Sequence, residues 1–169
     1  MLLKRFLFFV MIAFLSGTAS AQNIEAEANL KAVFIYNFTK YVEWDTNNGD
    51  FVIGVIGQSS VTSALNIIAR NNTVKNKKIV IKVFNKPEDI EYCNILFIPK
   101  NSFSLSSILE KTGKGTLTVS EENGYAKKGT AFNFVIVNNK LKFEANLKAL
   151  YLADLKAGSQ LLKLGIIVD

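Results

Sequence analysis

Histidine and cysteine, which serve many catalytic and metal sites, are nearly missing from this sequence. It contains no histidine, and its single cysteine is Cys93. Ser-His-Asp and Cys-His catalysis are therefore excluded, as are most zinc sites, which use histidine or several cysteines. An isolated thiol before an apolar run is typical of a small buried residue, although an odd cysteine can also be a reactive or intermolecular thiol.

Closely spaced carboxylates occur at three places, which are Glu43/Asp45, Glu88/Asp89 and Glu121/Glu122. Neighbouring residues on a helix or strand point in different directions, and no partner base or set of metal ligands accompanies any of these pairs. This pattern is typical of solvated turns and helix caps. We therefore expect a protein that is not an enzyme, with no catalytic residues, cofactor or metal site.

Two glycines, Gly54 and Gly57, lie between a predicted strand and a predicted helix. The position is loosely similar to a phosphate-binding loop. However, it lacks the G-x-G-x-x-G spacing and the lysine-serine pair of a P-loop. Close packing of strand against helix explains the glycines better than nucleotide binding does.

The N-terminus has the three parts of a secretory signal peptide. Lys4 and Arg5 precede an apolar run over 6–15, and small residues end at Ala21, where we expect cleavage. A membrane anchor is the alternative, but a run of about ten apolar residues is short for a span of about 20. Thr18 stands where a lipoprotein signal would have cysteine. The sequence therefore predicts an exported, soluble protein of about one domain, residues 22–169.

The positive charge of the chain is dispersed along it. The formal net charge is +6, and removing Lys4 and Arg5 with the signal peptide leaves +4. Arg70 is then the only arginine, whereas nucleic-acid-binding proteins cluster their charge and favour arginine. We expect no nucleic-acid partner, because scattered lysines are typical of a solubilised surface.

Hydrophobic periodicity predicts the elements that position these residues. Helices are expected at 24–44, 59–70 and 104–113, and strands at 51–57, 77–84, 93–100 and 115–121. A β-hairpin is expected over 130–146 around Asn138-Asn139, followed by one or two helices over 147–168. Asn146 is suited to cap the first of these C-terminal helices. The order predicts a single α/β domain with a mixed β-sheet flanked by helices and a C-terminal β-hairpin followed by helix.

The stretch "KAVFIYNFTKYVEW" (31–44) gives the first predicted helix an unusually wide apolar surface. A helix of this kind is either buried or meets a partner. We expect Phe34, Phe38 and Tyr41 to pack into the core, with Trp44 at the end of the helix. Tyr36 and Trp44 are also candidates for partner contact, because aromatic anchors dominate interface energetics.

The same stretch resembles the signature of the YfiR family, approximately K-A-x-F-x-Y-N-F-x-K-[FY]-x-x-W. The resemblance continues in "FVIGVIG", "CNILFIPK" and "GTLTVSE", and in the C-terminal run from "FNFVIVNNKLKFEAN" to "SQLLKL" (159–164). Asn133, Phe143, Glu144 and Asn146 fall where the family pattern has them. The similarity covers essentially the whole predicted mature chain, in order.

This resemblance implies a soluble periplasmic regulator in cyclic di-GMP signalling. It would bind and repress the periplasmic part of an inner-membrane signalling protein of the diguanylate cyclase type, as a homodimer and with a small-molecule effector as a further partner. The alternative is a periplasmic small-molecule-binding sensor module that acts without a cyclase partner. Partner-binding candidates are Tyr36, Tyr41, Trp44, Glu144 and Lys163.

The family is also associated with disulfides, and Cys93 matches one family cysteine. No second cysteine exists in this sequence to pair with it. Redox control through an intramolecular disulfide is therefore excluded by composition.

Overall fold

The computed structural model describes the backbone of residues 18–44 and 49–168, and side chains from Asn23 onward. The predicted signal peptide, residues 1–21, lies outside the part whose side chains are described. The helices are α2 (Thr18–Tyr41), α3 (Val61–Asn71), η1 (Pro87–Asp89), α4 (Leu105–Lys111), α5 (Leu147–Leu152) and α6 (Ser159–Leu162). The strands are β1 (Val42–Glu43), β2 (Phe51–Ile56), β3 (Thr73–Val74), β4 (Lys77–Phe84), β5 (Ile95–Ile98), β6 (Leu117–Ser120), β7 (Phe132–Val137), β8 (Lys140–Asn146), β9 (Lys156–Ala157) and β10 (Ile166–Val168).

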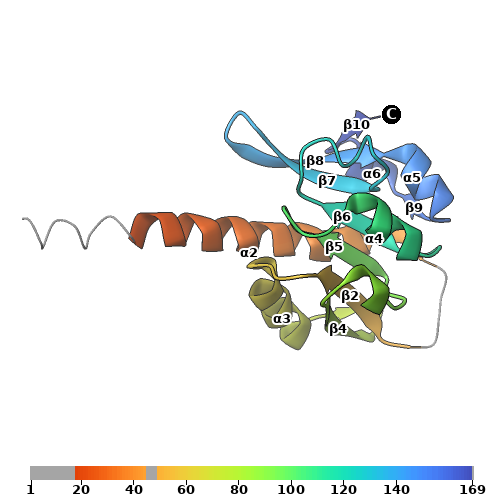
Figure 1. Ribbon diagram of the computed structural model, residues 1–169, viewed down its shortest axis with the longest axis horizontal. Coiled ribbons are helices and arrows are strands. Elements are labelled where there is room, and N and C mark those ends of the chain that lie inside the picture. The colour runs from red at the N-terminus through yellow and green to blue at the C-terminus, as the bar shows by residue number, and fades with distance from the viewer. Residues whose placement is uncertain (1–17, 45–48, 169) are drawn as a thin grey trace, which may run out of the picture.

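Eight strands form a mixed sheet in the order β10-β8-β7-β6-β5-β2-β4-β3. The five strands from β7 to β4 in this order are mutually parallel, whereas β8 and β3 run antiparallel to their hairpin partners β7 and β4. The short strands β1 and β9 pair separately. The predicted α/β domain with a mixed sheet and a β7–β8 hairpin followed by helix is thus confirmed (Figure 1).

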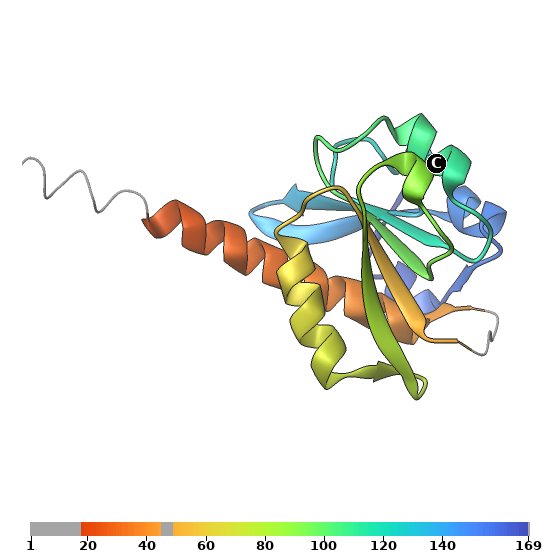
Figure 2. The same cartoon turned by 60° about the horizontal axis from the view of Figure 1, so that its bottom comes forward.

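Both faces of the sheet are covered, and its central strands therefore have nearly continuous apolar sequences. Helices α2 and α3 cover one face, over a core that includes Ile35, Phe38, Ile53, Phe97 and Phe132 (Figure 2). Helix α4, which contacts η1, covers the other face. The buried residues on that side include Ile56, Phe84, Leu96, Ile98 and Ile108. Phe38 is the centre of the larger core, because its ring lies 4.8–6.2 Å from those of Phe34, Phe132, Phe134 and Phe143.

The expected helices over 147–168 were only partly right. Helices α5 and α6 lie there, but strands β9 and β10 accompany them. Asp154 adopts a positive φ of 56°, which ends the first helical segment and turns the chain into β9. The β-branched run Ile166-Ile167-Val168 then pairs in parallel with β8, at the edge of the sheet.

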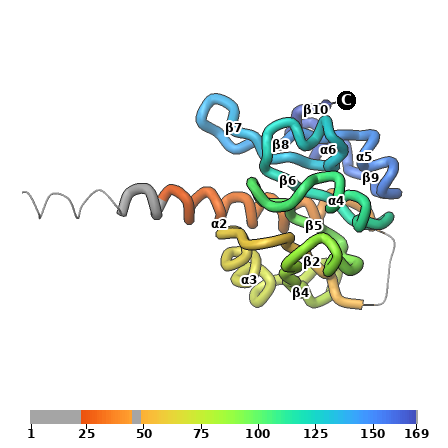
Figure 3. Tube along the Cα trace, viewed as in Figure 1, coloured from red at the N-terminus to blue at the C-terminus, as the bar shows by residue number. Residues whose placement is uncertain are grey.

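The predicted helix over 24–44 is confirmed as an element but ends at Tyr41. Val42 and Glu43 form β1 instead, because they pair with Ala157 and Lys156 of β9. At the other end, the first turns of α2 extend past the sheet and its covering helices (Figures 1 and 3). Ile24 is accordingly exposed, although it continues the face that is buried further along the helix.

Candidate functional site

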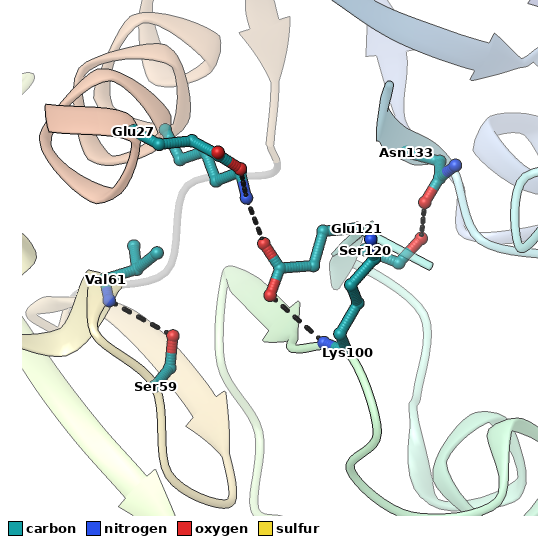
Figure 4. A network of polar contacts seen from close by, with 8 residues as sticks. Glu27, Ser59, Val61, Lys100, Ser120, Glu121 and Asn133 are labelled. Atoms are coloured by element: carbon teal, nitrogen blue, oxygen red, sulfur yellow. Dashed lines mark hydrogen bonds and ion pairs between the residues drawn. The ribbon is translucent and has the colours of Figure 1, made fainter. Parts of the chain in front are cut away.

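An ion-pair cluster lies where α2 crosses the carboxyl end of β6 (Figure 4). Lys31 falls on the buried face of α2 with Ala28, Ala32 and Ile35, and it is only 9% exposed. Its Nζ contacts Glu121 Oε2 and lies 2.5 Å from Glu27 Oε1, one turn earlier on α2. We call Glu27, Lys31 and Glu121 the Lys31 cluster; it ties the helix to the sheet.

The second carboxylate oxygen of Glu121 also has a partner. Its Oε1 accepts a hydrogen bond from the backbone N–H of Lys100 at 3.0 Å. Lys100 follows β5, whereas Glu121 follows β6, and the two strands are parallel neighbours. The Lys31 cluster is therefore built at the carboxyl edge of the parallel sheet, the edge at which α/β proteins commonly bind ligands.

The charge of Lys31 is retained despite its burial. Desolvation acts to lower the pKa of Lys31, but the hydrogen bonds and negative charges of Glu121 and Glu27 outweigh it and raise the pKa above 10.5. The side chain of Glu121 is itself only 13% exposed. Removing either partner of this nearly buried pair would leave the other group desolvated without compensation.

A cavity of about 250 Å³ opens beside the Lys31 cluster. Its polar lining comes from that cluster together with Lys100 and Asn123. Its apolar wall is the tip of the β7–β8 hairpin, through Phe134, Val135, Ile136 and Leu141.

A second polar network lies on the opposite face of β6. Successive side chains of a strand point to opposite faces, so Ser120 points away from the side that Glu121 occupies (Figure 4). Ser120 Oγ lies 2.8 Å from Thr130 Oγ1 and 2.7 Å from Asn133 Oδ1. Asn133 Nδ2 then donates to Glu144 Oε2 at 2.9 Å. The network fastens the hairpin to β6.

Of the predicted partner-binding residues, Tyr36 and Trp44 have contacts within the domain. Trp44 Nε1 donates to the Asn94 carbonyl at 3.0 Å, and its indole packs edge-on against Phe51. The hydroxyl of Tyr36 lies 3.5 Å from the Thr73 carbonyl oxygen, and Lys40 Nζ sits over its ring. Both side chains remain half-buried.

Tyr41 is not in the core, contrary to the expectation. It occupies the last position of α2 and is 42% exposed, because the chain leaves the helix there to form β1. Phe38 is fully buried as expected, and Phe34 is partly buried against Phe134 and Phe143.

Glu144 and Lys163 are placed differently from each other. Glu144 is half-buried and engaged with Asn133, whereas Lys163 is exposed directly after α6. Asn146 caps α5 as expected, since its side chain accepts a hydrogen bond from Ala149 N at 2.9 Å. Within the described residues, no contact joins Trp44, Glu144 and Lys163 into one site.

The sequence interpretation missed the Lys31 cluster. The sequence pattern predicts Glu121 as one member of a solvated carboxylate pair, but it is nearly buried and ion-paired. One local sign was available: Glu27 and Lys31 are four residues apart, and Lys31 interrupts an otherwise apolar helix face.

Cys93 is buried, which agrees with its reading as a small core residue. Burial raises the pKa of its thiol to about 12, only partly offset by a hydrogen bond from the Gly54 backbone and the charge of Lys82. A Cβ placed on Gly54 would lie 2.6 Å from the Phe84 ring and 3.1 Å from Cys93 Sγ. Close packing therefore accounts for this glycine.

Across residues 18–44 and 49–168, no three histidine, cysteine or acidic side chains gather in a way that could hold a metal ion. None of the helices in this part of the chain has the length and apolar character needed to cross a membrane.

Comparison with curated proteins gives no match for this chain. The sequence model of the family described as YfiR/HmsC-like, in contrast, matches residues 28–166. The matched region begins in α2 and ends at Ile166, the first residue of β10. It takes in the other seven strands of the sheet in full, together with Lys31 and Glu121 of the Lys31 cluster, whereas Glu27 lies just before it. On this evidence the chain belongs to the YfiR/HmsC-like family.

Proposed function

We propose that this protein is a periplasmic regulator that binds and represses the periplasmic part of an inner-membrane signalling protein of the diguanylate cyclase type. The observation that carries the proposal is membership of the YfiR/HmsC-like family, which is known for periplasmic regulators of cyclase signalling. The N-terminal sequence, with its basic start, short apolar run and small residues before Ala21, supports export.

A regulatory role is consistent with the chemistry of the described residues. The buried polar groups are used to join elements, as in the Lys31 cluster and the Ser120–Asn133–Glu144 network. The thiol of Cys93 is buried and protonated at neutral pH, so it is a poor nucleophile. We accordingly propose a function in binding, without catalysis.

For the partner surface we propose the end of α2 together with α6. Tyr41 is exposed there, and its carbonyl accepts a hydrogen bond at 2.7 Å from the N–H of Gly158, at the start of α6. Lys163 and the exposed Leu164 follow that helix. This α2–α6 surface combines an aromatic, an aliphatic and a cationic side chain, a mixture suited to a hot spot with a polar rim.

Trp44, Tyr36 and Glu144 have a supporting role in this proposal. Their contacts with Asn94, Thr73 and Asn133 hold the neighbouring elements in place. Substituting them would therefore alter stability as well as binding, and they are poor reporters of the interface.

In-cell crosslinking of the tagged full-length chain, followed by identification of proteins in the membrane fraction, tests this function. We expect recovery of an inner-membrane signalling protein, with Tyr41→Ala and Lys163→Glu each reducing its yield. Ile67→Ala on α3 and Lys127→Glu in the turn between β6 and β7 are matched controls, because both residues are exposed and lie outside this surface. Retention of the protein in the cytoplasm, or recovery of the protein only with itself, would contradict the proposal.

A further inference from the structure

The cavity beside the Lys31 cluster has the properties of a small-molecule site. It lies at the carboxyl ends of β5 and β6, between α2 and the hairpin tip, and is formed by residues from four separate segments. Its volume of about 250 Å³ is below the range of roughly 300–1,000 Å³ typical of sites for drug-sized ligands. A fitting ligand is therefore small.

The polar side of the cavity presents charges of both signs. An ammonium group has three N–H donors, and the Lys31 ammonium contacts two carboxylates, so a third donor is left over. Glu27 uses Oε1 for Lys31, and its side chain is 48% exposed, which leaves Oε2 accessible. A ligand acceptor can thus be bound by Lys31 and a ligand donor by Glu27, close to each other.

The opposite side of the cavity is apolar, and part of it is exposed. Ile136 and Leu141 are cross-strand partners in the β7–β8 hairpin. Ile136 is 57% exposed although it lies on the same face of the strand as the buried Phe134. An apolar group placed against these two side chains would remove them from water.

We propose that this cavity binds a free α-amino acid with an apolar side chain. The ligand ammonium pairs with Glu27, the ligand carboxylate pairs with Lys31, and the side chain packs on Ile136 and Leu141. Lys100, which lines the cavity and is exposed, adds positive charge on the carboxylate side. Binding in this form needs both ligand charges on one carbon, next to an aliphatic group.

Isothermal titration calorimetry on the full mature chain tests the proposal with leucine and two relatives that each lack one charge. Leucinamide has no carboxylate, and N-acetylleucine has no ammonium. We expect leucine to bind and each relative to bind at least about tenfold more weakly, because each loses a charge-assisted hydrogen bond. Equal affinities for all three, or no binding of leucine, isoleucine, methionine or phenylalanine up to about 10 mM, would overturn the proposal.

Two variants assign the binding to this cavity. Glu27→Gln removes the charge proposed for the ligand ammonium, at a position half-exposed on α2, and we expect about a tenfold or larger rise in Kd for leucine. Glu25→Gln is the matched control, because Glu25 is exposed on the same helix and does not line the cavity. Ile136→Ser should weaken the binding of leucine more than the binding of glycine, which has no side chain to pack on Ile136. Unchanged leucine affinity in Glu27→Gln would place any binding elsewhere and contradict the inference.

This inference does not depend on the proposed membrane partner. The titration uses purified protein alone, so amino-acid binding without recovery of a partner would uphold the cavity and leave the regulatory function unsupported. Recovery of a partner without amino-acid binding would support the regulatory function and overturn the amino-acid site.

Discussion

At the scale of single residues, Lys31 has the clearest energetic consequence. Removing one partner of a nearly buried ion pair leaves the other charge desolvated without compensation. In Lys31→Met the apolar stem would remain, but Glu27 and Glu121 would face each other without the cation. We expect a loss of about 2–3 kcal/mol in the free energy of unfolding, measured by urea denaturation at neutral pH.

Two further variants provide the comparison for Lys31→Met. Lys40→Met changes an exposed lysine of the same helix that contacts the Tyr36 ring and the Asn37 side chain, and it should cost about 1 kcal/mol or less. The double variant Lys31→Met/Glu121→Gln should recover part of the loss, because the unpaired buried carboxylate is then neutral. Equal effects of Lys31→Met and Lys40→Met would show that the cluster is not coupled to folding.

The raised pKa of Lys31 also leads us to expect a change in folding stability at alkaline pH. Its pKa is raised in the folded protein, so the ion pair contributes fully below the unfolded value of 10.5 and is lost as pH rises through the folded value. We expect the wild-type protein to lose more unfolding free energy than Lys31→Met between about pH 9 and pH 12. Parallel urea titrations of the two proteins measure the difference, and parallel pH profiles would contradict the assignment.

The thiol of Cys93 should be unreactive in the folded protein. Its thiol is fully buried and burial raises its pKa to about 12, so almost no accessible thiolate exists at pH 8. We expect negligible reaction with a thiol-specific chromogenic reagent in native buffer and one equivalent per chain in denaturing urea. Rapid labelling of the native protein would mean that the core around Gly54 and Phe84 opens readily.

At the scale of elements, the turn of the β7–β8 hairpin depends on an unusual backbone conformation at two asparagines. Asn138 and Asn139 have positive φ values of 51° and 57°, the pattern of a type I′ turn. Because asparagine tolerates the left-handed region better than alanine does, Asn139→Ala should destabilise the fold by about 1 kcal/mol. Asn139→Gly, at the same exposed position, should be neutral or stabilising in thermal denaturation. A milder effect of Ala than of Gly would contradict the turn assignment.

The elements that sequence predicted well are those with long, unambiguous patterns. The apolar run of β2, the alternation in β7–β8 and the asparagine pair between them gave the sheet and its hairpin. The two-residue β9 and three-residue β10 are too short to show a period, and both form only because distant strands pair with them. Tyr41 was misplaced because periodicity does not show where a helix leaves the body of the domain.

The candidate site was beyond sequence prediction for the same reason. Lys31 and Glu121 are 90 positions apart, and only the crossing of α2 over the end of β6 brings them together. The carboxyl edge of the parallel sheet could be foreseen as a place for a site, whereas the residues that line the cavity could not.

At the scale of the whole molecule, the end of β6 connects helix α2 with the β7–β8 hairpin. Glu121 fastens α2 to one side of the strand end, and the neighbouring Ser120 fastens the β7–β8 hairpin to the other. The cavity lies between those two fastened elements. A ligand there would contact both, so occupancy of the cavity can change how α2 and the hairpin lie relative to each other.

The same architecture predicts an uneven distribution of local stability. Every residue of β5 and β6 is buried, and each of these strands is hydrogen-bonded on both sides. In contrast, β10 is a three-residue edge strand with exposed isoleucines, and the first turns of α2 extend beyond the body. We expect amide hydrogen exchange in β5 and β6 to be slower by about a hundredfold or more than in β10 and the start of α2, because only the former require global unfolding. Hydrogen-exchange mass spectrometry over a range of protein concentrations measures this. Protection of β10 that rises with concentration would show that a second copy covers this edge, whereas β10 as protected as β5 at every concentration would contradict the predicted gradient.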